Sequence, residues 1–315
     1  TYHVLDTMPS LQRIEQFRQN QFIQQNNGSK AAKVSLSYVE PFFEHSLLEI
    51  SYDYDVTQMD ALRKVEDKIK SDEYGFPYFV DSLQVNYNYL FRSNRAGLTY
   101  QYEPNKTFRT TFGFVVQPVT LTGKLQDEHE QYTYSSVNLV PTAMFKWRFA
   151  KDMDWSMDYQ GKNNQPSFAH IIPVRDNTNS QNIIIGNPEL KAEFSNRIAT
   201  SIRKSIISRS QYLELNFAYN FISNKIVSDK TVIGNSTVQE TSFKNADGYY
   251  DLKWYYLFST PLFTESLQLD VFGNADYYNN LSYINQQRNL TKQVIYSQTL
   301  QLKYSWSDYF ESVFN

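Results

Sequence analysis

The sequence predicts an all-β protein whose strands carry different kinds of side chain on their two faces. Aromatic residues make up 16% of the chain, with 25 Tyr and 22 Phe, yet the mean hydropathy is only −0.55. Several segments alternate between apolar and polar residues, and their connections alternate between short turns and long loops. These observations are typical of a transmembrane antiparallel β-barrel, although alternation alone would also fit a β-sandwich.

Alternating segments follow one another after a polar beginning. In the clearest one, Leu48, Ile50, Tyr52 and Tyr54 share one face, which is the period of a strand. We count roughly a dozen such strands, each near the ~10 residues that an oblique bilayer crossing requires. They cover residues 33–39, 48–54, 85–102, 108–122, 137–149, 155–159, 194–205, 211–229, 238–258, 267–277 and 294–306. Residues 1–30 are rich in Gln and Asn and are expected to form a loop, with a helical turn around residues 11–17.

The connections divide into two kinds. Long loops are predicted at residues 55–80, 124–135, 161–190 and 279–289, and short polar turns separate the other strands. Bacterial barrels place short turns on the periplasmic side and long loops outside the cell, so the long loops are expected to face outward. Aromatic residues recur at strand ends, where an interfacial girdle would need them: Tyr52, Tyr54, Tyr100, Tyr102, Trp147, Tyr304 and Trp306.

Composition excludes several classes of protein. The formal net charge is −3, which gives no electrostatic reason to expect nucleic-acid binding. Cysteine is absent, which removes disulfides and thiol chemistry. No apolar run is long enough for a transmembrane helix. The chain begins at Thr1 without a signal peptide and ends at Asn315 within an apparent strand, so we expect a portion of a longer protein.

No catalytic, cofactor or metal site is predicted. The four histidines, His3, His45, His129 and His170, are far apart and show no zinc-binding spacing. Neither a nucleophile elbow nor a phosphate-binding glycine loop is present. Acidic pairs occur at Asp152/Asp154, Glu189/Glu193 and Asp308/Glu311, and two carboxylates can serve glycoside hydrolysis. Because Glu189 and Glu193 flank a turn, an architectural role is the better interpretation, and we predict that the chain is not an enzyme.

The most informative stretch is residues 166–193, which we call the signature segment. At its centre, Gly186-Asn187-Pro188 predicts a turn, because Gly tolerates positive φ and Pro moves Asn187 out of the helical region. The segment carries apolar islands at Phe168, Ile171-Ile172 and 183–185. A long loop with its own apolar anchors is typical of an ordered, functional loop.

The signature segment resembles that of the outer-membrane β-barrel family of TonB-dependent receptors. In that family a Pro-Ser pair leads through an Asp-Asn stretch into Gly-Asn-Pro-x-Leu-Lys-Pro-Glu and then a strand. The matching positions are Pro166, Ser167, Pro173, Asp176, Asn177, Asn179, Gly186, Asn187, Pro188, Glu189, Leu190, Lys191 and Glu193. Ala192 stands where the family usually has Pro, and Gln165 where Arg is common. We assign structural roles to Pro166, Ser167, Gly186, Asn187, Pro188, Leu190 and Glu193, and transfer no ligand-binding residue.

The resemblance implies that residues 1–315 are part of one outer-membrane barrel of about 22 strands, of the size class that is plugged. The implied function is energy-coupled uptake of a bulky or scarce solute across the outer membrane. The implied partners are outer-membrane lipid, a TonB-type energy-coupling protein that acts through a plug outside this sequence, and a surface lipoprotein. Some outer-membrane barrels serve assembly or secretion instead, and the sequence does not separate those roles from import.

The alternative from another class is a soluble or surface-attached β-sandwich that binds a ligand such as carbohydrate through surface tyrosines. Tyr277 and Tyr278, beside the Asn-rich residues 279–289, are the best candidates for ligand contact. His170 is the one histidine within the signature segment, and it is the third candidate.

Overall fold

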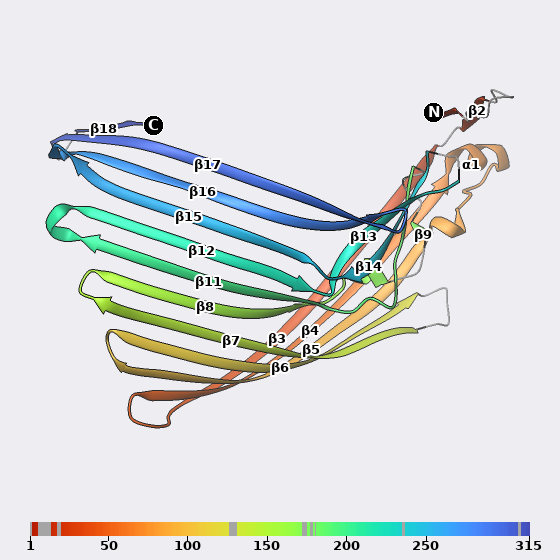
Figure 1. The fold of residues 1–315 in the computed structure, drawn as a ribbon. Helices are drawn as coiled ribbons and strands as arrows, with labels where there is room; N and C mark the ends of the chain where they lie inside the picture. The colour runs from red at the N-terminus through yellow and green to blue at the C-terminus, as the bar shows by residue number, and fades with distance from the viewer. Residues whose placement is uncertain are drawn as a thin grey trace.

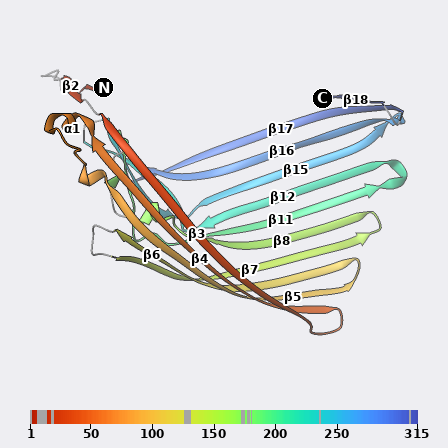
Figure 2. The same cartoon turned by 180° about the vertical axis from the view of Figure 1, so that it is seen from behind.

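A computed structural model describes residues 2–5, 14–17, 20–125, 131–171, 175–176, 179, 181–234, 237–307 and 310–315. It shows a long, curved, mainly antiparallel sheet (Figures 1 and 2). No helix in the described part of the chain has the length and apolar character needed to cross a membrane. The strands are β1 (Tyr2–Leu5), β2 (Ile14–Phe17), β3 (Gln21–Pro41), β4 (Ser46–Asp67), β5 (Val85–Asn105), β6 (Phe108–Leu125), β7 (Gln131–Ala150), β8 (Met153–Asn164), β9 (Arg175–Asp176), β10 (Asn182–Ile185), β11 (Glu193–Ile206), β12 (Gln211–Ser223), β13 (Lys225–Val232), β14 (Gln239–Ala246), β15 (Tyr249–Leu262), β16 (Thr264–Ile284), β17 (Gln287–Ser307) and β18 (Phe310–Phe314). The helices are α1 (Lys68–Tyr74), α2 (Phe168–Ile171) and the 3-10 turns η1 (Asp81–Leu83) and η2 (Ile207–Arg209).

Twelve of these strands form what we call the wall. They are β3 to β8, β11, β12 and β15 to β18, and each pairs antiparallel with the next one along the chain. The predicted dozen strands and the all-β fold are therefore confirmed. A β-sandwich would need two sheets packed face to face, whereas the wall is one continuous sheet, so the sandwich alternative is wrong.

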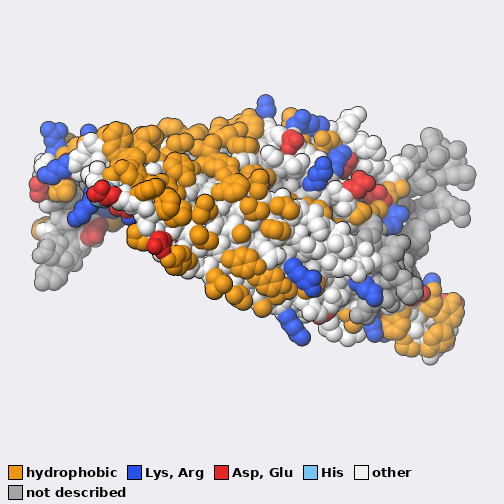
Figure 3. Space-filling view, turned by 90° about the horizontal axis from the view of Figure 1, so that it is seen from below, with side chains coloured by type: hydrophobic (Ala, Val, Ile, Leu, Met, Phe, Trp, Pro, Cys, Tyr) orange, Lys and Arg blue, Asp and Glu red, His pale blue; other side chains and the backbone are white. Residues whose placement is uncertain are grey.

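The two faces of the wall differ in chemistry because the register aligns like residues across strands. Tyr38, Ile50, Leu98, Phe114 and Pro141 lie opposite one another in one continuous row. Such rows form the outer face, and many of their large side chains are exposed. Figure 3 shows a broad apolar area on one side of the molecule, with most charged side chains toward its two ends. An apolar band flanked by polar ends is what a barrel presents to lipid.

Polar rows occupy the other face, which we call the inner face. Ser35, Asp53 and Arg95 are consecutive cross-strand partners, and Lys33 lies 3.7 Å from the Asp53 carboxylate. Further along the sheet, Asp158 accepts a hydrogen bond from Arg197 at 2.8 Å. Every second residue thus faces the lumen, which in large barrels is wet and polar.

Short turns close one end of the wall, as predicted. The turns 42–45, 106–107 and 151–152 link neighbouring strands there, and η2 and Phe263 make two more. His45 and Phe263 adopt positive φ values of 61° and 58°, which lets the chain reverse tightly. The longer connections lie at the opposite end, which we call the mouth (Figure 1).

The predicted lengths of four loops are wrong. Residues 279–289 are strand in β16 and β17, joined by Asn285 and Gln286 with φ values of 51° and 65°. Strand β4 continues to Asp67, so β4 and α1 occupy most of the predicted loop 55–80. Strand β3 begins at Gln21, inside the predicted N-terminal loop. The predicted loop 124–135 shrinks to the stretch between β6 and β7, and its residues 126–130 lie outside the described part.

Two further sequence expectations are settled by the same elements. Residues 14–17 form a strand instead of part of a helical turn, and residues 11–13 are outside the described residues. The predicted loop 161–190 holds the end of β8, then α2, β9 and β10. His3 and His129, like Pro173 and Asn177, fall on side chains that the structure does not describe.

The strand extensions have a simple cause. A 21-residue strand is about 70 Å long, whereas an oblique bilayer crossing uses only about 9–11 residues. The part of β3 and β4 beyond the membrane meets water on both faces, so its sequence no longer needs to alternate between apolar and polar residues.

A closed barrel resists SDS until it is heated, because its strands have no free edge at which unfolding can start. We expect the full-length protein to fractionate with the outer membrane and to migrate faster on an SDS gel before boiling than after. A soluble protein without a mobility shift would contradict the barrel.

Candidate functional site

A small sheet lies at the mouth, formed by segments between wall strands. It contains β13 and β14, which leave the wall after β12, and β9 and β10, which leave it after β8. We call these four strands the mouth sheet. β14 pairs antiparallel with β13 and parallel with β10, and β10 pairs with β9. In Figure 1, β13, β14 and β9 lie at the mouth end of the molecule, in the same part of the view as the mouth ends of β3, β4 and β5.

The mouth sheet is attached to the wall at both of its edges. On one edge, β13 pairs with β16 through Asp229 and Tyr283. The Asp229 carboxylate is buried there and accepts hydrogen bonds from Gln286 N at 3.1 Å and Lys244 Nζ at 2.7 Å. On the other edge, Arg63 of β4 forms an ion pair with Asp176 of β9 at 2.9 Å. Since β4 and β16 are distant in the order of the wall, the mouth sheet forms a partition between them.

The turn of the signature segment is fixed by Asn187. Its side-chain oxygen accepts a hydrogen bond from Glu189 N at 2.9 Å, which closes an Asx turn. Its amide donates to the carbonyl oxygen of Phe243 on β14 at 2.9 Å, and its backbone N–H donates to His170 O at 2.6 Å. One asparagine thus joins the two halves of the signature segment to the mouth sheet.

The rest of the segment is attached to the same hairpin and to the wall. Lys191 exchanges two backbone hydrogen bonds with the Asn245 side chain, at 2.7 and 2.9 Å. Glu193 Oε1 accepts from Ile226 N at 2.7 Å, and Tyr134 Oη accepts from Ala192 N at 2.9 Å. Of the remaining predicted residues, Pro166, Gly186 and Leu190 are buried, whereas Ser167 and Pro188 are exposed.

Ile171 anchors the first half of the segment to the inner face. It is 3% exposed and packs with Leu121. Four aromatic side chains surround this pair: Tyr87, Tyr89, Phe91 and Tyr134. The apolar residue predicted to order the loop therefore sits on an aromatic patch of β5, β6 and β7, inside the wall.

His170 lies beside Asn187 and stacks on the mouth sheet. Its ring centre is 4.2 Å from that of Phe243, with the two planes tilted by 35°. Burial lowers the pKa of His170, and the nearby Glu193 carboxylate acts in the opposite direction without cancelling the shift. The neutral imidazole is therefore the form that fits this packing.

Acid should loosen this part of the mouth. Because the folded-state pKa of His170 lies below the ordinary value of about 6.5, the unfolded segment binds more protons, and stability is lost as pH falls through that range. We expect amide exchange in residues 182–193, corrected for its intrinsic pH dependence, to be less protected at pH 5.5 than at pH 7.5. His170→Gln should remove most of this difference, and an unchanged difference in that variant would contradict the assignment.

The two tyrosines predicted to bind ligand point to different faces. Tyr277 lies in the row of Leu252 and Val294 on the outer face and stacks against Tyr250 with a centroid distance of 5.8 Å. Tyr278 is its inward neighbour, opposite Asp251, and Lys253 Nζ lies 5.9 Å from its ring centre. Because they lie on opposite faces, they cannot form one site. Ligand contact in the lumen remains a prediction for Tyr278, whereas the Tyr277 side chain faces away from the lumen.

The inner face near Tyr278 holds polar groups that the sequence did not single out. Lys225 Nζ lies 4.1 Å from the ring centre of Tyr249, whose hydroxyl donates to Asp251 at 3.2 Å. Asn220 also donates to Asp251, at 2.6 Å. These residues come from three different elements: the register of β12 with β15 places Asn220 opposite Asp251, and Lys225 of β13 reaches Tyr249 beside them.

A shallow hollow of about 510 Å³ lies along the same face of β8, β11, β12, β15 and β16. Its polar lining includes Asp158, Arg197, Lys253, Tyr255 and Asp276. An ion pair between Arg197 and Asp158, amide groups and the Tyr255 ring in one concave surface suit a polar solute that also has a flat or apolar part. Among the described residues, no group of three or more His, Asp or Glu side chains is placed to hold a metal ion.

Comparison with known proteins identifies the architecture. The sequence matches the outer membrane protein beta-barrel family over residues 7–313. No functionally curated protein matches the sequence. Three solved structures share the fold: the hemophore receptor HasR of Serratia marcescens, bound to HasA and heme (TM-score 0.55, 10% identity), the copper transporter OprC (0.60, 9%), and the iron transporter FrpB of Neisseria meningitidis (0.53, 13%).

These structures are longer than the chain. The aligned region covers 91%, 90% and 90% of this chain but only 55%, 50% and 41% of HasR, OprC and FrpB respectively. At such low identity the likeness shows the fold alone, and it agrees with the resemblance to TonB-dependent receptors found in the signature segment. The protein is located in the cell outer membrane. The chain belongs to the outer membrane protein beta-barrel family.

Proposed function

We propose that this chain is part of an outer-membrane receptor that takes up a bulky or scarce solute by energy-coupled transport. The observation that carries the proposal is the mouth sheet, which is made of wall connections and attached to the wall at both edges. A structure at that position meets a solute arriving from outside the cell before the solute reaches the lumen.

The inner face supports the same proposal. Below the mouth sheet, the hollow lined by Arg197, Lys253 and Asp276 offers charges of both signs together with the Tyr255 ring. The three structurally similar proteins are a hemophore receptor bound to its hemophore and heme, an iron transporter and a copper transporter. Chelated metals and heme therefore form the first set of solutes to test. A TonB-type energy-coupling protein and a surface lipoprotein are the partners that this proposal implies.

Transport requires the mouth sheet to detach from the wall along one edge so that the solute can pass. Its edge on β4 is attached through the Arg63–Asp176 ion pair, in which the Asp176 side chain is 42% exposed. Its edge on β16 is attached by strand pairing and by the buried Asp229. The partly exposed ion pair is the weaker attachment because solvent screens it, so opening is expected to begin at β9.

The test is uptake by cells that carry only the full-length protein as their receptor. Radiolabelled ferric chelates, heme and copper would be supplied one at a time, with and without the proton gradient. We expect one of them to accumulate only when the gradient is present. Lys253→Gln should raise the concentration that gives half-maximal uptake, while Lys204→Gln on the outer face should not.

The control guards against indirect effects, since both variants remove one positive charge from a wall strand. Gradient-independent accumulation would point to a passive pore. Export of a protein in place of uptake would move the barrel to an assembly or secretion role.

A further inference from the structure

Three aromatic rings lie exposed together at the mouth end, directly after β4. This strand ends at Asp67, and α1 follows it without a loop. The ring centre of Tyr74 in α1 lies 6.0 Å from that of Phe76 and 5.7 Å from that of Tyr78. Tyr74 and Phe76 are 52% and 60% exposed. We call these three residues the aromatic tip. Figure 1 shows α1 at the end of the molecule away from the short turns.

Several hydrogen bonds hold the aromatic tip in place although it is exposed. The Asp67 carboxylate caps α1 by accepting from two backbone N–H groups of its first turn, at 3.0 and 3.2 Å. Gly75 ends the helix with a φ of 75°, a left-handed cap that glycine adopts without strain. The Ser71 hydroxyl accepts from Tyr78 N at 2.9 Å and donates to Asp67 O at 2.8 Å. The rings are thus displayed on a fixed scaffold, which lowers the entropy cost of binding a ligand.

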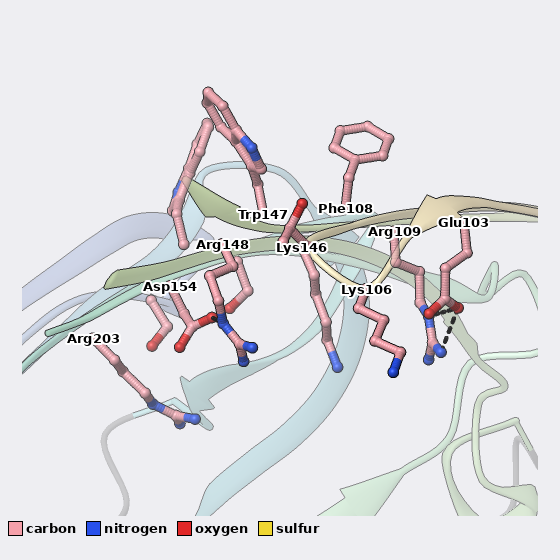
Figure 4. Close-up of a pocket in the computed structure, with 13 residues that line it drawn as sticks. Glu103, Lys106, Phe108, Arg109, Lys146, Trp147, Arg148, Asp154 and Arg203 are labelled. Atoms are coloured by element: carbon pink, nitrogen blue, oxygen red, sulfur yellow. Dashed lines mark hydrogen bonds and ion pairs between the residues drawn. The ribbon is translucent and has the colours of Figure 1, made fainter. Parts of the chain in front are cut away.

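Exposed rings on the wall itself have membrane lipid as their occupant. Figure 4 shows Phe108 and Trp147 extending to one side of the sheet, while the charged side chains of Arg109 and Lys146 extend to the other. The register agrees, because Phe108 is the cross-strand partner of Trp147 in an outer-face row. Rings in such rows face the bilayer or its interface, so they need no further ligand.

The aromatic tip is too far from the bilayer for the same explanation. The outer-face positions of β4 are apolar or aromatic from Leu48 to Val56, and they become polar at Gln58 and Asp60. From Val56 to the end of β4 at Asp67 the strand runs about 35 Å further. The head-group layer on one side of a bilayer is only about 5–8 Å thick. Even an oblique strand therefore carries α1 beyond the lipid head groups, into the water outside the cell.

The size of the aromatic tip argues against a folded protein as its occupant. A fully buried aromatic side chain contributes about 150–250 Å², so three rings that are about half exposed offer about 300 Å². A stable protein interface needs about 800 Å² from each partner. The aromatic tip therefore suits a ligand that binds through one or two ring-sized units.

Charge around the rings favours a neutral ligand over an anionic one. Asp72 and Glu73 of α1 are exposed, and neither has an ion-pair partner among the described residues. The one lysine beside the rings, Lys70, is already engaged, with its Nζ 4.6 Å from the ring centre of Tyr78. Unpaired carboxylates repel anionic chelates and acidic chains. Because carboxylates only accept hydrogen bonds, they suit a ligand that carries hydroxyl donors.

A sugar ring meets all of these requirements. It is neutral, it carries several hydroxyl groups, and the C–H bonds on its face are weakly positive. The face of an aromatic ring is negative, so a sugar ring and an aromatic ring attract each other when they stack.

We propose that the aromatic tip binds a neutral polysaccharide outside the cell. Sugar rings stack on Tyr74 and Phe76, and the carboxylate of Glu73, which directly precedes Tyr74, accepts hydrogen bonds from sugar hydroxyls. The chemistry is the same for a glycan that is taken up and for a glycan of the cell surface. The inference does not depend on energy-coupled uptake, since the aromatic tip lies outside the wall.

The experiment uses the full-length protein in detergent micelles and a panel of immobilised neutral glycans: α-glucan, β-glucan, xylan and mannan. Alginate serves as the anionic probe. We expect at least one neutral glycan to bind, with the same affinity at low and high salt because the ligand carries no charge. Tyr74→Ala and Phe76→Ala should each weaken binding about two- to tenfold, the range of one aromatic contact. Ile69→Ala, a change on the same helix outside the three rings, should have no effect.

Four results would overturn the proposal. The first is that no neutral glycan of the panel binds, and the second is equal loss of binding in Phe76→Ala and Ile69→Ala. The third is Phe76-dependent binding of heme or alginate that exceeds the binding of every neutral glycan, which would show an anionic ligand. The fourth is loss of a bound protein from Phe76→Ala while glycan binding stays unchanged, which would show a protein-binding surface.

Uptake by cells then distinguishes the two sources of the glycan. If the glycan is the transported solute, Phe76→Ala should raise the concentration that gives half-maximal uptake of the labelled oligosaccharide. If it is a polymer of the cell surface, the purified surface polysaccharide should bind in the same assay and uptake should not change. Intact glycan binding without uptake of any solute would contradict the proposed transport function and leave the present inference standing.

Discussion

Gly273→Val should prevent the wall from closing between β16 and β17. A Cβ atom at Gly273 would lie 2.4 Å from the carbonyl oxygen of Ser297 and 3.0 Å from the Tyr256 hydroxyl. The first of these is backbone and cannot rotate away, so β17 would have to shift along the ladder in which Gly273 faces Gln298. Overpacking of this kind costs about 1–3 kcal/mol, and here it also displaces a hydrogen-bonded strand.

Heat-dependent gel mobility measures the effect directly. The full-length Gly273→Val protein should lose most of its fast-migrating, SDS-resistant form, while Gly273→Ala should show an intermediate loss. Gly28→Val is the matched control, since a Cβ at Gly28 in β3 would meet nothing within 4 Å. If Gly273→Val remained as resistant as the control, the close approach of β16 and β17 at this point would be wrong.

The faces of the strands could be predicted because alternation is a local property. Leu213, Leu215, Phe217 and Tyr219 alternate with polar residues in the sequence, and the register places them opposite Phe258, Tyr256, Trp254 and Leu252 in one apolar layer. Because one face of such a strand meets lipid and the other meets water, the alternation determines which side chains point outward.

Strand lengths could not be predicted by the same argument. Asn279, Asn280 and Asn289 suggested a loop, yet the structure has them in paired strands near the mouth. Asn279 donates to the Gly248 carbonyl oxygen at 2.8 Å, and Asn289 to the Ser282 hydroxyl at 3.2 Å. Asparagine is common in turns because of its local hydrogen bonds, and here a cross-strand partner and a partner on another hairpin satisfy these side chains instead.

The candidate site was predictable only in part. The turn at Asn187 and the anchor at Ile171 follow from the signature segment itself. Their partners do not, because the Asn187–Phe243 and Lys191–Asn245 hydrogen bonds join residues 56 and 54 positions apart. No local pattern contains such information.

Leu190→Asp should release the signature segment from the β13–β14 hairpin and leave the wall intact. Leu190 is 1% exposed, and two residues close to it in the chain are held in place, since Asn187 and Lys191 bind backbone and side-chain groups of β14. A buried Leu→Ala change costs about 2–5 kcal/mol. An unpaired carboxylate in the same place adds a desolvation penalty, so the segment is expected to leave its site rather than bury the charge.

Hydrogen exchange can separate this effect from general unfolding. Residues 182–193 and 239–246 should lose protection together, because the hydrogen bonds of Asn187 and Asn245 connect them. The wall strands should keep their protection, and the heat-dependent gel shift should persist. Leu190→Met preserves the apolar volume and serves as the control. If residues 182–193 became unprotected while 239–246 stayed protected, the β13–β14 hairpin would be stable without the signature segment, and the partition could open by releasing that segment alone.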